Sequence, residues 1–421
     1  MSDRLSEIIA DPPPGPPVHN GASEAKPVVS EAQGLRLLLA LSVILFFAYI
    51  CVAMALPVVS VHVVKGLGLS NGWGGLAAGM AFVSTIFSRA WAGGVSDRLG
   101  PKPAMARGLW FYLMGAVICI LAGVLGAQPW LALAVLLLGR AIVGVGESYV
   151  SVSMVAWGIG LAGQHRAGRV MAFMGAAMYG ALGAGAPLGL LLYHIGGFSA
   201  VMSFSALLPL IGLLAIIKMP GVAPHAATMR RSFLSMIGTI WKHGFVILAQ
   251  GIGFAAIGAF FSLYFLAQGW QGAGLGLTAF GAGFVLVRVL FGHLPDRIGG
   301  LPVAMVSLGV EVIGQLLIWG GDMSGLALLG AFMTGLGCSM IYPSMGREVV
   351  ALVSPQQRGM ALGGFAAFQD LAYGLTGPVA GMLADRAGYG PIFLIGAIAA
   401  ASGLGMVLWL RRGARIAVHG T

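Results

Sequence analysis

The chain alternates between long apolar stretches and short polar connections. The apolar stretches run for about 18 to 30 residues, which is long enough to cross a bilayer core of about 30 Å. Each stretch is continuous, so the pattern predicts membrane-spanning helices and disfavours the alternating strands of a barrel. We expect twelve spans, at residues 35–64, 73–96, 104–125, 130–158, 170–193, 200–217, 245–267, 275–294, 301–319, 326–345, 360–384 and 393–410.

Composition supports a membrane protein. Of the 421 residues, 58% are hydrophobic and 9% are charged, whereas a soluble domain has about 25% charged residues. The net charge of +10 would suggest a nucleic-acid partner in a soluble chain. Here the cations lie mostly in short loops between apolar stretches, where they orient the chain against the lipid bilayer. We therefore predict an all-α polytopic membrane protein that has no nucleic-acid partner.

The distribution of Lys and Arg tests the number of spans. With both termini in the cytoplasm, all but five of the 23 cations lie on the cytoplasmic side. Lys65 and Arg386 fall outside, and Arg89, Arg140 and Arg288 fall within spans. A miscounted span would invert every later loop, so the asymmetry favours an even number of spans. We expect a multi-pass protein of the cell (inner) membrane, and a monomer.

The connection between spans six and seven divides the chain into two halves. It is longer than the other loops and contains Pro220, Pro224 and the pair Arg230-Arg231. The predicted organisation is a disordered cytoplasmic tail (1–34), an N-terminal six-helix bundle (35–217), a cytoplasmic linker (218–244), a C-terminal six-helix bundle (245–411) and a second cytoplasmic tail (412–421).

Two sequence echoes relate the halves. The segment from Arg89 to Gly100 recurs from Arg288 to Gly299, with matching Arg, Gly, Asp and Arg positions 199 residues apart. A second echo pairs residues 137–146 with 328–337 at an offset of 191. Parallel six-span repeats with a binding site at their interface are typical of transporters.

Several motifs resemble those of one transporter family. The loop Gly93-x-x-x-Asp97-Arg98-x-Gly100-x-Lys102 is similar to the signature loop of the major facilitator superfamily. Further segments resemble motifs of its drug/proton antiporters: Leu56-Pro57-Val58 in span one, Arg140-x-x-x-Gly144-x-Gly146 in span four, a partial match at residues 183–189 in span five, and Gly377-Pro378-x-x-Gly381 in span eleven. The resemblance covers about residues 35–411 and is closest to the sugar-efflux and multidrug-efflux branch. It implies the twelve-helix fold of that superfamily.

The signature loop and its repeat suggest a gate. Arg89, Gly93 and Asp97 are spaced i, i+4, i+8 and so follow one helix face. A charge pair that forms only when the cytoplasmic side is closed would bias a two-state carrier. The alternative is a topology marker with solvated charges. The predicted gating residues are Arg89, Gly93, Asp97 and Arg98 with their repeat mates Arg288, Gly292, Asp296 and Arg297.

Charged side chains inside a span point to function because they are costly in lipid. Arg140 and Glu147 share span four, two turns apart, and project from one face about 10 Å apart along the helix. Glu147 has no acidic repeat mate, since the offset of 191 leads to Cys338. An acid in one half only fits a proton-coupling site. The alternative for Glu147 is a structural ion pair within the bundle. Arg140 is a candidate substrate-binding residue that holds an anion or counters Glu147, and both side chains could line one cavity.

Span eleven supplies a second candidate, Asp370, as a protonatable group or a substrate ligand. The alternative is an ion pair with Arg347 or Arg358. Glu311 in span nine is expected to contact Arg288 rather than substrate. Aromatic and amide side chains that suit sugars and drugs give the remaining candidate substrate-binding residues: Tyr49, Tyr179, Gln250, Phe254, Tyr342 and Gln369.

No cofactor or enzymatic activity is expected. The matches to G-x-S-x-G and G-x-G-x-x-G lie outside the structural contexts that those motifs require, and the eight histidines form no close ligand pair. The leading hypothesis is a secondary active transporter that exports a small organic solute in exchange for protons. A proton symporter that imports a sugar or organic anion is the alternative, and a non-transporting membrane receptor or scaffold is an alternative of another class.

Overall fold

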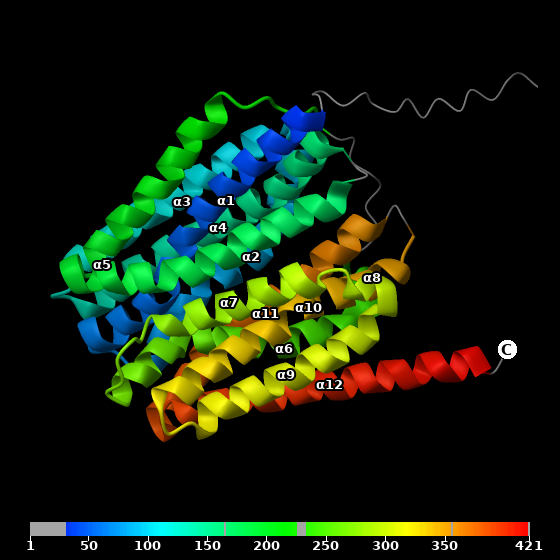
Figure 1. Ribbon diagram of the computed structural model, residues 1–421. Helices are drawn as coiled ribbons and strands as arrows, with labels where there is room; N and C mark the ends of the chain where they lie inside the picture. The colour runs from blue at the N-terminus through cyan, green and yellow to red at the C-terminus, as the bar shows by residue number, and fades with distance from the viewer. Residues whose placement is uncertain (1–30, 164–165, 225–232, 355–356, 420–421) are drawn as a thin grey trace, which may run out of the picture.

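A computed structural model describes residues 31–163, 166–224, 233–354 and 357–419 (Figure 1). These residues contain helices and no β-strand. The helices of the first half are α1 (Glu31–Val61) with its π-helical extension η1 (His62–Gly66), α2 (Asn71–Leu99), α3 (Pro101–Val124), α4 (Pro129–Ala162) and α5 (Ala167–Ile217). Those of the second half are α6 (Phe233–Ala267), α7 (Leu275–Phe291), α8 (Leu294–Ile298), α9 (Gly300–Gly320), α10 (Ser324–Ala351), α11 (Arg358–Ala387) and α12 (Gly390–His419).

The described helices make twelve passes in two six-helix repeats. α5 contains spans five and six, because Gly197 adopts a positive φ of 68° and turns the chain between them. α7 and α8 together form span eight and are separated at Gly292. Eight described helices are long and apolar enough to cross a membrane. The interface helices α2 and α11 are not among them, since both carry charged residues along with many small ones.

Three helices differ in extent from the sequence prediction. α1 begins at Glu31 and α6 at Phe233, so the second part of the predicted linker is helical. α12 continues to His419, through most of the predicted C-terminal tail. Hydropathy marks where a helix enters lipid, whereas the helix itself continues into water as long as its backbone hydrogen bonds continue. Residues 1–30 of the predicted disordered tail (1–34) lie outside the described residues, as do Arg230 and Arg231.

The two repeats pack against each other through matching helix pairs. α2 contacts α11, and α5 contacts α7. In Figure 1 the helices α1, α3, α4 and α5 form one body, α6, α9 and α12 form the other, and α2, α7 and α11 lie between them. The beginning of α1 and the end of α12 lie on the same side of the molecule (right in Figure 1). We call this the terminal side, and the other the opposite side.

The loop motif has the same backbone in both repeats. Gly100 and Gly299 follow α2 and α8 and share a φ of 91°. Residues with a side chain rarely adopt this conformation, so glycine is required at both turns. The turn lets α3 and α9 begin at once, at Pro101 and Gly300. The 199-residue echo thus reflects one turn geometry used twice.

The core consists of one cluster in each bundle and a third that both halves build. The shared cluster lies where α1, α2 and α5 meet α6 and α7, and it includes Ala53, Leu56, Ala78, Leu182, Phe254, Ile257, Phe260 and Phe280. Small residues on α2 and α11 bring the helices close together. A Cβ placed on Gly75 would overlap the carbonyl oxygen of Gly377, and one on Gly79 would overlap that of Gly374. The halves are therefore in intimate contact toward the opposite side.

Candidate functional site

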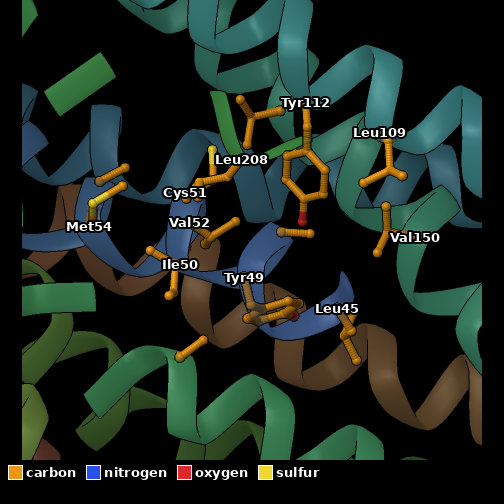
Figure 2. Packing of buried hydrophobic residues seen from close by; sticks show 14 of the residues in the cluster. Leu45, Tyr49, Ile50, Cys51, Val52, Met54, Leu109, Tyr112, Val150 and Leu208 are labelled. Carbon is orange, nitrogen blue, oxygen red and sulfur yellow. The ribbon is translucent and has the colours of Figure 1, made fainter. Parts of the chain in front are cut away.

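Glu147 lies at the centre of the N-terminal bundle. Its side chain on α4 is 7% exposed. The hydroxyl of Tyr49 on α1 donates to one carboxylate oxygen, and the hydroxyl of Tyr112 on α3 donates to the other at 2.9 Å. Figure 2 shows both tyrosines set among apolar side chains such as Leu45 and Val150. Two donors inside an apolar shell hold this acid in a fixed position.

An ion pair links the two halves. Arg89 on α2 donates to the carboxylate of Asp370 on α11, and their side chains are 23% and 11% exposed. The alternative that Asp370 pairs with Arg347 or Arg358 is therefore wrong. The reason is geometric, because α2 packs along α11 and brings Arg89 to the level of Asp370.

These charges form one cluster rather than two separate sites. Glu147 and Tyr342 lie within electrostatic range of the Arg89 guanidinium, as Asp370 does. α2 and α4 begin at the opposite side, and Arg89 and Glu147 each lie about 18 residues after the first residue of their helix. α11 ends at the opposite side, and Asp370 lies about 17 residues before its last residue. At 1.5 Å per residue, all three lie about 26 Å from the opposite side. Sequence analysis identified both acids but assigned Arg89 to the gate.

Arg140 lies in the same bundle as Glu147, and this acid is within electrostatic range of its guanidinium. Its side chain is 1% exposed, and its guanidinium donates to the backbone carbonyls of Ala77 and Ala78 at 3.4 Å. Within the described residues Arg140 forms no direct ion pair with Glu147, and its guanidinium is enclosed between α4 and α2. The reason is that α4 approaches α2 closely at Gly144, where a Cβ would overlap the carbonyl of Ala81. Arg140 is placed to tie two helices of one bundle together.

Aromatic side chains fill the interface next to the charged cluster, toward the opposite side. Tyr179 of α5 stacks on Phe284 of α7 with ring centroids 3.3 Å apart, and its hydroxyl is bonded to Tyr373 of α11. Phe254 packs against the ring of Tyr373, and the amide of Gln369 donates to the Tyr373 hydroxyl at 2.8 Å. Three predicted candidates thus meet at Tyr373, which sequence analysis missed. Its spacing of i+4 from Gln369 is the signal that could have found it.

Two other candidates lie at different places. Tyr342 on α10 packs against Phe365 and faces the Arg89–Asp370 pair. Gln250 on α6 is buried in the C-terminal bundle, where its side chain interacts with the Cys338 thiol. It therefore belongs to the interior of that bundle.

Glu311 shares this interior. It is fully buried, and neither carboxylate oxygen has a hydrogen-bond partner that meets ordinary geometry among the described residues. Its polar neighbour is Cys338. The expected contact with Arg288 is wrong, because the Arg288 guanidinium lies over the ring of Phe284, 5.3 Å from its centroid. α9 packs on α10 and α12, away from α7.

The predicted gating loops lie at the terminal side. Asp97, Arg98, Asp296 and Arg297 are all exposed. Nothing lies within 4 Å of where a Cβ of Gly93 would be. In this conformation no ion pair joins the two loops in the described part of the chain. Arg89, about two turns from Asp97 on the same helix, is a predicted gating residue that does join the halves.

A second contact between the halves lies on the opposite side. The carboxylate of Asp385, near the end of α11, accepts hydrogen bonds from the backbone amides of Asn71 and Gly72 at 2.9 and 3.2 Å, and from the Asn71 side chain at 2.8 Å. Tyr389 donates to Asn71 at 2.7 Å. Partial burial alone would raise the pKa of Asp385, but these donors outweigh it and hold that pKa below its usual value. Asp385 thus caps the first turn of α2 from the other half.

A small void lies in the interface between the halves. A void of about 10 Å³, room for roughly one water molecule, lies among Leu56, Phe82, Phe254 and Tyr373. No group of three or more His, Cys, Asp or Glu side chains in the described ranges is placed to hold a metal ion. The arrangement offers ionisable groups where the two halves meet, and it is tightly sealed on the opposite side.

Comparison with known proteins places this geometry in a family. The model of the Major Facilitator Superfamily matches residues 41–277 and 244–418. An uncharacterized MFS-type transporter of Salmonella typhimurium, STM4428, is 39% identical over 372 residues, which cover 88% of this chain and 96% of the relative. An uncharacterized MFS-type transporter of Escherichia coli K12, YhhS, is 35% identical over 376 residues, covering 88% and 93%.

Solved structures share the fold at low sequence identity. A D-xylose-proton symporter aligns with a TM-score of 0.74 and 17% identity over 90% of this chain and 97% of its own. The human organic anion transporter MFSD10 aligns with a TM-score of 0.65 and 16% identity over 89% and 99%. The relatives and the fold neighbours are transporters, not enzymes.

Proposed function

Because this chain belongs to the major facilitator superfamily, we propose that it is a proton-coupled secondary transporter that exports a small organic solute by antiport. The observation that carries this proposal is the ion pair between Arg89 and Asp370, with Glu147 in electrostatic range of both. One cation is thus shared between acids of different halves. Protonation of either acid changes how strongly the halves attract each other at that point.

The proposed cycle uses this competition. Deprotonated Asp370 holds Arg89 and ties α2 to α11. When Asp370 takes up a proton its carboxyl becomes neutral, and Arg89 is released toward Glu147 or toward a bound solute. The halves can then rock about the site. Glu147, held by Tyr49 and Tyr112, is the second proton-coupling residue.

Sidedness follows from the charge distribution. We propose that the terminal side faces the cytoplasm, since Lys and Arg are concentrated there, and that the protein is a monomer of the inner membrane. The described conformation is then closed toward the outside, where Asp385 caps α2. The exposed loops that carry Asp97, Arg98, Asp296 and Arg297 would form the inner gate when the cytoplasmic side closes. The antiporter-like motifs of spans one, four and eleven support the efflux branch.

The test uses proteoliposomes that contain the full chain and the pH dye pyranine. Sugars, organic acids, amino acids and cationic drugs are added in turn, and solute-induced proton movement is recorded. We expect at least one of these classes to move protons. Asp370→Asn and Glu147→Gln should abolish proton-driven uphill flux and leave solute exchange partly intact, because exchange needs no net proton transfer.

Glu311→Gln is the matched control, a buried acid outside the cluster, and should keep coupled flux. Undiminished uphill flux in both cluster variants would reject the assignment of the coupling acids. Solute movement without any pH change would reject proton coupling itself. Inside-out and right-side-out vesicles under one imposed pH gradient separate export from the symport alternative.

A further inference from the structure

The two arginines of the repeated segment face different partners. Arg89 and Arg288 occupy equivalent positions 199 residues apart. Arg89 pairs with Asp370. The position equivalent to Asp370 at the offset of 191 is Tyr179, and Tyr179 is the polar group within electrostatic range of Arg288. A carboxylate stands against the first arginine and a phenol against the second.

The backbone supports this equivalence. Gly79 of α2 meets the carbonyl of Gly374 of α11, and the equivalent contact joins Thr278 of α7 to Gly183 of α5. There the Thr278 hydroxyl donates to the Gly183 carbonyl at 2.8 Å. Gly79 and Thr278 are 199 residues apart, and Gly183 and Gly374 are 191 residues apart. The α5–α7 contact is thus the repeat of the α2–α11 contact, and only its charge balance differs.

Arg288 has no anionic partner among the described residues. No hydrogen bond or ion pair to it is found there, and its Nε atom is buried without a partner. Its guanidinium lies over Phe284, which stacks on Tyr179. An arginine over an aromatic face keeps the donors of its two terminal nitrogens available for a bidentate anion. A cation in a membrane span that lacks a protein anion is favourably completed by an anion from outside the chain.

We propose that Arg288, with Phe284 and Tyr179, binds the anionic group of the transported solute, and that the solute is an organic anion. This deepens the proposed transport function and rests on it. The carboxylate or equivalent group lies against Arg288, and the body of the solute stacks on the aromatic side chains that lead to Tyr373. The anion then takes the place that Asp370 holds in the other repeat.

The experiment measures thermal unfolding of the purified full-length protein at constant ionic strength. The probes are three acids, each matched with a neutral counterpart of similar shape: benzoate with benzamide, 1-naphthoate with 1-naphthamide, and gluconate with glucose. We expect at least one acid to raise Tm more than its counterpart. Arg288→Gln should weaken that apparent affinity by about tenfold to a hundredfold, as expected for loss of a charged hydrogen-bonding group. Arg288→Lys keeps the charge but loses the bidentate guanidinium, so its apparent affinity should lie between those of the unsubstituted chain and Arg288→Gln.

Two further variants test the site while Arg288 itself is kept. Tyr179→Asp places in this repeat the carboxylate that the other one has, so it should pair with Arg288 and abolish the preference for the acid. Tyr179→Asn removes the same phenol without adding a charge, so it should weaken the preference less than Tyr179→Asp does. Arg412→Gln removes an exposed arginine from α12, outside the proposed site and gate, and is the charge control. The inference is overturned if no acid exceeds its neutral counterpart, or if Arg288→Gln retains the full effect.

A lipid headgroup offers the same chemistry as a soluble anion. The measurement is therefore repeated with phosphatidylglycerol added to the detergent. Stabilisation by this lipid alone, lost in Arg288→Gln, would make Arg288 a lipid site and overturn the solute assignment. Failure of the two proposals is distinguishable. If Asp370→Asn abolishes coupled flux while acids and neutral counterparts stabilise equally, transport stands and the anion site falls. If the acid effect needs Arg288 but no solute moves protons, proton coupling falls.

Discussion

Gly377→Ala tests whether the close approach of α2 and α11 holds the opposite side closed. A Cβ on either Gly75 or Gly377 would overlap backbone of the other residue. The helices must separate by roughly 1 Å or more to restore ordinary contact. Overpacking of this kind costs about 1–3 kcal/mol. If the cost falls only on the closed conformation, the ratio of closed to open molecules should fall roughly 5- to 150-fold.

The assay is the distance between spin labels at Lys65→Cys and Arg386→Cys. These two positions are exposed on the opposite side, one in each half, and the native cysteines are buried. We expect Gly377→Ala to shift the distance distribution to longer values. Gly94→Ala is the matched control, since nothing lies within 4 Å of its Cβ position. An unchanged distribution in Gly377→Ala would refute the reasoning.

Three further predictions concern single contacts. The same spin labels should report opening of the opposite side when the pH falls below the usual carboxyl pKa. The pKa of Asp385 is low, so its hydrogen bonds to α2 are complete at neutral pH and are lost as pH falls through that pKa. Asp385→Asn should therefore be partly open at every pH. A pH-independent distance in the unsubstituted chain would contradict this. Gly335→Ala should lower Tm, because its Cβ would overlap the backbone of α7 and the cost is again about 1–3 kcal/mol, whereas Gly309→Ala, with free space around it, should leave Tm unchanged or raised. Glu311→Gln should keep Tm, since neither carboxylate oxygen has a hydrogen-bond partner of ordinary geometry to lose, and a large drop in a thermal-unfolding scan would show that the acid is structurally bonded.

Much of the fold was predictable because the bilayer restricts the options. A continuous apolar stretch in lipid must be helical, so hydropathy gives the type of element, and the distribution of Lys and Arg supports an even number of spans. The loop motif is equally local, since Gly100 and Gly299 adopt the one turn that their neighbours permit. Helix ends were less predictable. α6 begins twelve residues before its apolar span, because helical hydrogen bonding does not require lipid.

The site was only partly predictable. Sequence identified Glu147 and Asp370 because ionisable residues inside a span are rare, but it could not say which cation faces each of them. The spacing of Arg89 to Asp97 assigned Arg89 to the gate, and Arg140 was expected to hold an anion or to counter Glu147. The packing of α2 against both α4 and α11 decided otherwise. Partners between elements depend on crossing geometry, which hydropathy does not encode.

The repeat itself explains why the chemistry should be asymmetric. Both halves build the same helix contacts, so the backbone gives two equivalent corners of the interface, the α2–α11 contact and the α5–α7 contact. If the corners also carried identical side chains, proton and solute would compete for identical sites, and neither would be specific. Instead one corner pairs Arg89 with Asp370, and the other sets Arg288 against Tyr179. An acid that can lose its proton and a cation without a protein anion are complementary. In the proposed mechanism the first contact exchanges protons and the second holds negative charge, and Glu147 lies within electrostatic range of the first. Coupling then requires no contact between proton and solute, because each changes the attraction across the same interface.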